Sequence, residues 1–215
     1  MHTLSYSETT NQLVGNQAGL LEAPAPAAEF AHTLITSRQN ISPKRLVEPG
    51  PNLVQQAQLF SAAAAAPDHG LLIPWRFVMV PAHRRADLGE VFALALIDRD
   101  PGATLEQIEA AREKAQRAPF LILAVARLGL CVPDTPILER MVAVGAAIQN
   151  LLLSAHSLGF GSSLTSGQAM QSPRMRTLFE LQPGERAVCF VNVGTVSLRK
   201  ILRLRPEAAC FVSSL

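Results

Sequence analysis

The feature that most constrains this fold is a long apolar helix predicted around residue 150. Asp-Thr-Pro at 134–136 is typical of a helix start, the apolar pattern runs over 137–158, and Gly159 is a typical helix end. From Met141 onward the helix is apolar nearly all round, so we expect it to be buried on every side. Its Gln, Asn, Ser and His residues argue against a membrane span. In a chain of 215 residues, such a helix is expected at a subunit interface.

Composition and charge favour an oligomer that binds neither nucleic acid nor a membrane. Charged residues make up 17% of the chain, against about 25% in an average domain, which predicts more buried surface than usual. The net charge of +2 is too small for a protein that coats nucleic acid. The three cysteines form no C-x-x-C pair, and the first basic residue is Arg38. A disulfide framework, a zinc ribbon and a secretory signal are therefore excluded as primary interpretations, and a cytoplasmic protein is expected.

The sequence predicts one domain, residues 29–215, after a flexible N-terminal extension, residues 1–28. The extension is polar and then rich in Ala and Pro. Strand patterns cover 75–81, 120–125, 160–164, 186–196 and 209–213, and helix patterns cover 28–36, 52–66, 84–97, 103–118, 137–158 and 172–179. This alternation predicts an α+β or α/β layered fold. The apolar chain end is expected to pair with a sheet, either in its own subunit or in a partner subunit.

Several common catalytic motifs are absent. The sequence has no P-loop, no nucleophile elbow and no H-E-x-x-H, and its five histidines show no metal-ligand spacing. Gly-Phe-Gly at 159–161 begins a dinucleotide fingerprint, but Leu164 stands in place of the third glycine. We therefore predict no catalytic side chain and no metal site.

The first of three polar clusters lies at 37–45 and contains Arg38, Lys44 and Arg45. Three cations and several hydrogen-bonding side chains suit a phosphate or a delocalised anion, because charge-assisted hydrogen bonds are strong. A solvated basic turn has the same composition, so both interpretations stay open here.

The other two clusters follow a helix end and a strand. Residues 66–77 contain a turn with His69 and then a strand start. Residues 159–167 offer backbone N–H groups and hydroxyls. Downstream, Arg203 and Arg205 point to the same side of an extended segment, which fits either a grip on one phosphate or a basic surface tail.

Taken together and in this order, the clusters resemble the FMN-dependent nitroreductase family, in particular its branch of small NAD(P)H nitroreductases. The most specific likeness is A-P-D-H-G-L-L-I-P-W-R-F at 66–77. It is joined by R-A-P at 117–119, by G-A-A-I-Q-N-L-L-L at 145–153 leading to G-F-G at 159–161, and by Gly-Thr at 194–195. The likeness covers about 28–215. It implies an α+β homodimer with a central mixed sheet flanked by helices, FMN at the interface, and a C-terminal segment exchanged between subunits.

The resemblance also implies which residues hold FMN. The family's R-R-S segment reads Arg38-Gln39-Asn40, with Arg38 on the phosphate side, so Gln replaces an Arg and Asn replaces a Ser. After two extra residues, Lys44 or Arg45 is expected to stabilise the negative charge of reduced flavin at its N1–O2 edge. His69 is implied to lie along the ribityl chain, and Arg203 and Arg205 near the phosphate. Leu164, Thr165 and Ser166 are implied to lie beside the ring, with a backbone N–H of Thr165 or Ser166 toward its N5–O4 edge.

The implied reaction is hydride transfer from NAD(P)H through flavin N5 to an electron-poor small molecule, such as a nitroaromatic or a quinone, by ping-pong turnover in one pocket. Two alternatives remain. The altered R-R-S segment could leave a dimeric ligand-binding or interaction module without flavin. The chain could also keep flavin and not use nicotinamide, with oxygen chemistry or dehalogenation as its reaction.

Overall fold

The computed structural model describes residues 25–131, 133–199, 201 and 204–215. By its internal contacts the chain divides after Ser37, and the second unit is Arg38–Leu215. In the first unit, α1 spans Ala25–Ser37, and the Thr36 hydroxyl donates to the His32 carbonyl at 2.8 Å. The extension predicted at 1–28 lies mainly outside the described residues, so its flexibility and the boundary at 29 stay predictions.

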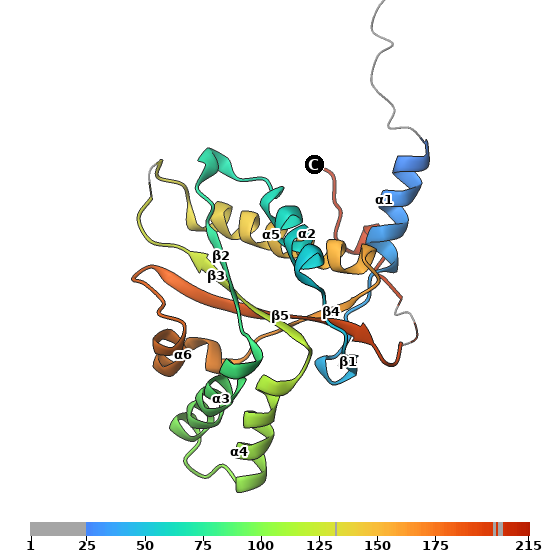
Figure 1. Cartoon of the computed structure of the whole chain (residues 1–215). Helices are drawn as coiled ribbons and strands as arrows, with labels where there is room; N and C mark the ends of the chain where they lie inside the picture. Colours follow the sequence, from blue (N-terminus) through green and yellow to red (C-terminus); the bar gives the residue numbers. More distant parts are fainter. Residues whose placement is uncertain (1–24, 132, 200, 202–203) are drawn as a thin grey trace, which may run out of the picture. The chain divides into compact units, whose positions relative to one another are not determined.

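A five-stranded antiparallel sheet forms the centre of the second unit (Figure 1). The strand order is β1-β5-β3-β2, and β4 also pairs with β5, because β5 is long enough to hold several neighbours. The parallel part of the predicted mixed sheet is one isolated bridge between Asn40 and Ser162. The strands are β1 Leu46–Val47, β2 Trp75–Met79, β3 Phe120–Arg127, β4 Gly161–Thr165 and β5 Glu185–Val196.

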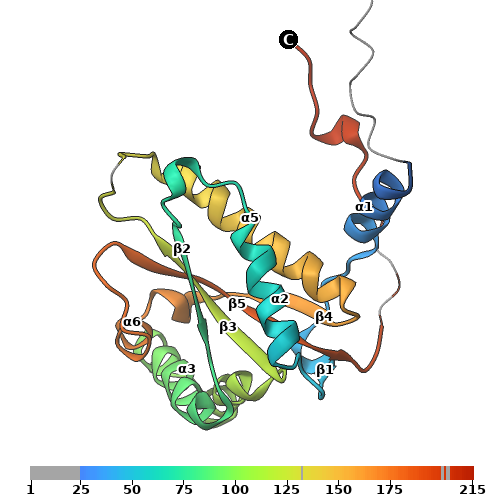
Figure 2. The same ribbon diagram turned by 45° about the horizontal axis from the view of Figure 1, so that its top comes forward.

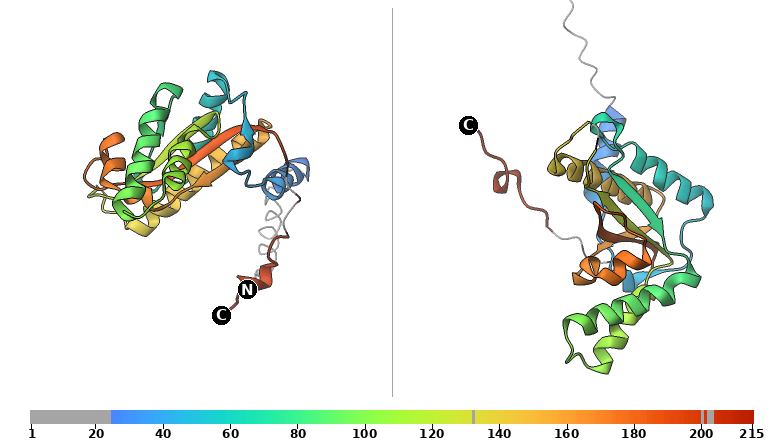
Figure 3. Two further views of the ribbon diagram at one scale, coloured as in Figure 1. Left: turned by 90° about the horizontal axis from the view of Figure 1, so that it is seen from below. Right: turned by 90° about the vertical axis from the view of Figure 1, so that its left-hand side faces the viewer.

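Helices cover both faces of this sheet (Figures 1 and 3). On one face lie α2 (Leu53–Ala64) and α5 (Ile137–Ser157), which pack side by side (Figure 2). On the other lie α3 (Arg85–Arg99), α4 (Leu105–Arg112) and α6 (Pro173–Leu178). β3 is apolar on both sides because alternate residues enter two cores. Its Ile122 and Ala124 pack toward α5, and Leu121 and Leu123 toward α3. The predicted α+β fold is confirmed.

The helix α5 is buried on one face only within a single chain. Its inner residues, such as Val144, Ala147 and Leu151, lie in the core, whereas Leu138 is 80% and Val142 69% exposed. The expectation of burial on every side is therefore not met within one chain. By length and composition α5 could cross a membrane, yet its inner face packs into the core in the way of a core helix of a globular protein. The predicted cap at 134–136 makes no side-chain capping bond.

The predicted terminal strand at 209–213 is wrong for a single chain. A short 3-10 helix, η6, occupies Ala208–Cys210, and the described residues from 204 onward form no strand and are exposed. Their apolar side chains include Phe211 and Val212. An unpaired segment has no neighbouring strand to fix its extended conformation. Exchange of this segment between subunits stays a prediction.

Candidate functional site

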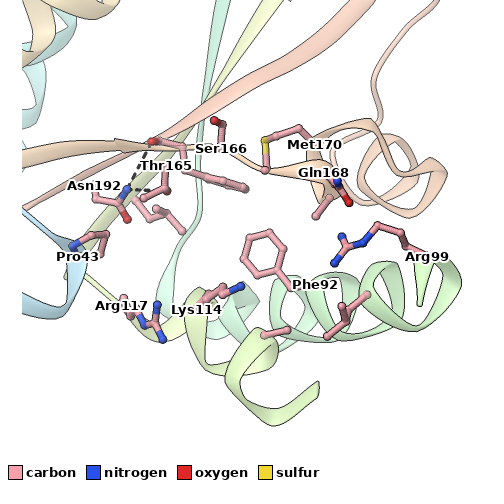
Figure 4. Close-up of a pocket in the computed structure, with 16 residues that line it drawn as sticks. Pro43, Phe92, Arg99, Lys114, Arg117, Thr165, Ser166, Gln168, Met170 and Asn192 are labelled. Atoms are coloured by element: carbon pink, nitrogen blue, oxygen red, sulfur yellow. Dashed lines mark hydrogen bonds between the residues drawn. The ribbon is translucent and has the colours of Figure 1, made fainter. Parts of the chain in front are cut away.

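A cavity of about 300 Å³ opens between the sheet and the α3–α4 hairpin (Figure 4). Its charged lining consists of Arg99, Lys114 and Arg117, and no carboxylate of the described residues lines it. Lys114 and Arg99 extend their charged ends into it on either side of the Phe92 ring (Figure 4). The remaining lining residues are Pro43, Leu96, Ala111, Leu121, Thr165, Ser166, Gly167, Gln168, Ala169, Met170, Phe190 and Asn192. The cavity therefore suits a partly apolar group with electronegative atoms.

The strand β4 brings Thr165 and Ser166 to this cavity. It lies antiparallel against β5, with Thr165 opposite Phe190 and Leu164 opposite Val191. Side chains directly opposite each other share a face. Phe190 lines the cavity, whereas Val191 packs into the core on the α5 side. Thr165 therefore faces the cavity, and Leu164 faces the opposite side of the sheet, away from it.

Lys114 and Arg117 are cavity residues that the sequence analysis missed as site residues. The chain leaves α4 in a 3-10 turn, η4 (Glu113–Gln116), and then enters β3. The buried Arg85 donates to the carbonyl of Ala115 in this turn (2.8 Å) and to that of Val80, just after β2 (2.9 Å). Burial lowers the pKa of Arg85. The Arg85 guanidinium thereby fixes the conformation of the turn from which Lys114 and Arg117 reach the cavity. The R-A-P motif at 117–119 was the available signal.

A second cationic group gathers around Arg38. Arg205 Nη2 donates to the Arg38 carbonyl at 2.8 Å, and the buried Nε of Arg38 has no hydrogen-bond partner among the described residues. Burial, and then the charge of Arg205, lower the pKa of Arg38. Burial, followed by the charges of Arg38 and Arg199, lowers the pKa of His156. No salt bridge joins Arg38, Arg199 or Arg205 to a described carboxylate. Uncompensated guanidinium groups at this spacing favour a bound anion.

The segment predicted to bind flavin connects the two cationic groups. Gln39 is half-buried, and Asn40 bridges to Ser162 of β4. Lys44 is exposed and Arg45 half-buried on the 3-10 turn η1 (Pro43–Arg45). Neither lines the cavity, although Pro43 beside them does. Arg203 lies outside the described residues.

His69 lies at the opposite end of α5 from the Arg38 group. It sits on the 3-10 turn η2 (His69–Leu71), and its Nδ1 is 2.6 Å from Glu139 Oε1 in the first turn of α5. The charge of Arg38 instead contributes to the lowered pKa of His156, which lies in the last turn of α5. Those two turns are roughly 25 Å apart at 1.5 Å per residue. A single chain therefore does not bring His69 to the Arg38 group.

Comparison with known proteins decides the family. The profile of the Nitroreductase family matches residues 47–195, more than half of the chain. The chain belongs to the nitroreductase family. A Haemophilus influenzae protein whose name gives it as an NAD(P)H nitroreductase is 33% identical over 77% of this chain and 88% of its own. As a member of this family, the chain is an oxidoreductase, which confirms the enzyme class predicted from the sequence.

Solved structures support the fold of this nitroreductase-family chain. A nitroreductase-like protein from Bacillus cereus superposes with a TM-score of 0.74 at 17% identity, over 86% of this chain and 95% of that one. Iodotyrosine deiodinase, in complex with FMN and 3-iodo-L-tyrosine, superposes with a TM-score of 0.62 at 19% identity, over 82% and 95%. At these identities the likeness establishes a nitroreductase-like fold.

Proposed function

We propose that the chain is an FMN-dependent oxidoreductase that uses NAD(P)H to reduce an electron-poor small molecule. Bound FMN would supply two-electron redox chemistry between the nicotinamide and the acceptor, and the residues of the chain would bind and orient it. The observation that carries the proposal is the pair of cationic groups joined by the segment 38–45. One group is Arg38, whose Nε has no hydrogen-bond partner in the described part of the chain, with Arg205 bonded to its carbonyl, and the other is the cavity with Lys114. FMN has the matching pair of electronegative ends, a phosphate and a pyrimidine edge.

The phosphate end fits the Arg38 group. A phosphate offers charged acceptors to Arg38 Nε, which has no hydrogen-bond partner among the described residues, and to the Arg205 guanidinium. Its charge would offset the repulsion by Arg205 that, after burial, lowers the pKa of Arg38. Gln39 replaces the second Arg of the family's R-R-S segment and so removes one positive charge. Arg38 and Arg205 still supply two positive charges to the phosphate end. The residues present therefore fit the phosphate.

The ring end fits the cavity. Lys114 would hold a positive charge near the N1–O2 edge, where negative charge develops on reduction. Ser166 lies beyond the last paired residue of β4, so its backbone N–H is available to the N5–O4 edge. Phe92 and Met170 also line the cavity and would shield a bound ring from water. No side chain is needed as a nucleophile.

A homodimer would complete this site. The outer face of α5 is apolar at Leu138 and Val142 and has no cover within the second unit. If two copies packed α5 against α5 in antiparallel order, the first turn of one helix would lie beside the last turn of the other. His69 of the partner subunit would then approach the Arg38 group. This arrangement reconciles the implied role of His69 with its distance from Arg38 in one chain.

The first test is the visible absorption spectrum of the purified full-length protein, before and after addition of excess FMN and desalting. We expect retained absorbance in the blue flavin band and NAD(P)H oxidation that depends on an added nitroaromatic or quinone. A colourless protein that does not retain FMN would contradict the proposal and favour a ligand-binding module. Retained flavin without NAD(P)H oxidation would favour a flavin enzyme that does not use nicotinamide.

A further inference from the structure

An amide side chain lies in the middle of the sheet, on the floor of the cavity. Asn192 lies in the β5 segment 190–193 that pairs with both β3 and β4, opposite Leu121 on one side and Ser163 on the other. It is 2% exposed, and its neighbours on the same face are the apolar Leu121 and Phe190 and the buried Ser163. A buried amide is costly unless its polar atoms are satisfied.

The hydrogen bonds of Asn192 fix the direction of its amide. Nδ2 donates to the Ser163 carbonyl (3.3 Å), to Thr165 Oγ1 (3.0 Å) and, at 3.5 Å, to the Phe190 carbonyl. Carbonyl oxygens accept hydrogen bonds and cannot donate them, so the nitrogen and not the oxygen faces this side. The oxygen Oδ1 therefore points the other way, on the side of Pro43 and Arg117 (Figure 4).

The oxygen Oδ1 is left as an acceptor for a ligand. No described residue donates a hydrogen bond to it, and it is not among the fully buried polar atoms, so it is open to the cavity that Asn192 lines. The charged groups of the lining, Arg99, Lys114 and Arg117, are cations, which donate hydrogen bonds, and backbone N–H groups after β4 also donate. The cavity thus combines several donors with one acceptor of fixed direction.

We propose that Asn192 Oδ1 accepts a hydrogen bond from the N3–H of the flavin pyrimidine ring. The edge of that ring carries the sequence O2, N3–H, O4, which is acceptor, donor, acceptor. N3–H is the donor of that edge, and Asn192 Oδ1 is the acceptor that the cavity holds in a fixed direction, while Lys114 and the backbone N–H at Ser166 supply donors for O2 and O4. Asn192 is therefore a binding residue that selects a ring with an imide N–H. The inference rests on the proposed function, because it takes FMN as the ligand.

The test compares FMN with its 3-methyl derivative, which lacks the N3–H. Full-length protein freed of flavin is titrated with each compound, and dissociation constants are read from flavin fluorescence. For the wild-type chain we expect FMN to bind about tenfold more tightly than 3-methyl-FMN, the value of one hydrogen bond to a buried acceptor. Asn192→Ala should weaken FMN binding by about tenfold and leave 3-methyl-FMN binding nearly unchanged.

Two controls separate this role from a structural one. Thr165→Val removes the Oγ1 acceptor of Nδ2 but not Oδ1, so the preference for FMN over 3-methyl-FMN should persist. If the Ala variant does not fold, Asn192→Ser is a second variant, with a polar side chain shorter than that of Asn. It should also lose the preference for FMN over 3-methyl-FMN. If either Asn192 variant weakens both flavins equally, the amide only supports Thr165 and the inference is wrong. If the wild-type chain binds neither flavin, the proposed function fails and the inference fails with it.

Discussion

Arg205 Nη2 donates a 2.8 Å hydrogen bond to the main-chain carbonyl of Arg38, which brings the Arg205 guanidinium to the backbone of Arg38, and neither residue forms a salt bridge with a described carboxylate. The two residues are far apart in sequence and belong to segments that the sequence analysis assigned to the same phosphate. Their like charges repel, and after burial this repulsion contributes to the lowered pKa of Arg38. An anion between them would turn this repulsion into attraction.

Arg38→Ala should therefore weaken FMN binding by about 10- to 100-fold, the usual range for loss of a charge-assisted hydrogen bond to phosphate. Riboflavin lacks the phosphate, so its affinity should change little. The measurement is the pair of dissociation constants, FMN and riboflavin, for each variant. Arg84→Ala is the matched control, because Arg84 is exposed and pairs only with Asp87. An equal loss for both flavins would place the phosphate elsewhere.

Lys114→Met should make the two-electron reduction potential of the bound flavin more negative. Lys114 lines the cavity and its positive charge stabilises the negative charge of the reduced ring. Loss of an interaction of about 1.4 kcal/mol corresponds to a shift of about 30 mV. Lys44→Met is the control, since exposed Lys44 does not line the cavity. A larger shift for Lys44→Met would restore the role that the sequence assigned to Lys44.

Most elements of this fold could be predicted from the sequence because their patterns are local. The helix expected at 137–158 is α5, Ile137–Ser157, and the strand expected at 186–196 is β5, Glu185–Val196. The strand β1 was missed, because a two-residue strand such as Leu46–Val47 is set by its pairing with the end of β5 and not by its own pattern.

The site was harder to predict than the fold. Lys114 follows a charged helix pattern that is typical of a solvated surface, and only the break from α4 into η4 turns it toward the cavity. Asn192 lies within an apolar strand pattern, where its sequence neighbours give no sign of a cavity below. His69 could be recognised by its motif, but its distance from Arg38 depends on the length of α5, which no motif records.

Glu185→Gln should destabilise the fold at neutral pH and have less effect in acid. Glu185 accepts from Arg76 Nε (3.0 Å) and Nη2 (2.7 Å), and this contact, foremost, holds the pKa of Glu185 below its ordinary value. A lowered folded-state pKa gives stability that is complete above the unfolded pKa of about 4.3 and is lost as the pH falls through the folded value. Breaking a buried pair costs roughly 2–4 kcal/mol at pH 7.

Urea unfolding of the wild type and Glu185→Gln between pH 7 and pH 2.5 measures this effect. The difference in unfolding free energy should be largest at pH 7 and should shrink below about pH 4.3, where Glu185 becomes neutral in both states. Glu90→Gln removes an exposed pair with Arg112 and should change stability much less. A difference between wild type and Glu185→Gln that is independent of pH would show that the charge of Glu185 is not the cause.

Gly161→Ala should destabilise the junction of β1, β4 and β5. A Cβ at this position would lie 2.5 Å from Val196 Cγ2 and 2.9 Å from Leu46 Cδ2, so neighbouring strands would have to move apart. Overpacking of this kind costs about 1–3 kcal/mol, measured as unfolding free energy in urea. At Gly167 a Cβ meets nothing within 4 Å, so Gly167→Ala is the control and should be nearly neutral. Equal effects at both sites would argue against close packing at Gly161.

Val142→Arg should dissociate the proposed homodimer and reduce FMN retention together, because the proposed site draws on both subunits. Val142 is 69% exposed on the outer face of α5, so within one chain an Arg there meets solvent and should leave the unfolding of the monomer unchanged. Across an α5–α5 interface, two buried and unpaired guanidinium groups would be strongly unfavourable. Sedimentation velocity measures the oligomeric state, and the absorbance of retained flavin reports the site. Leu105→Arg, on an equally exposed apolar residue of α4, is the control and should change neither. A Val142→Arg variant that stays dimeric and retains FMN would exclude this face of α5 as the interface.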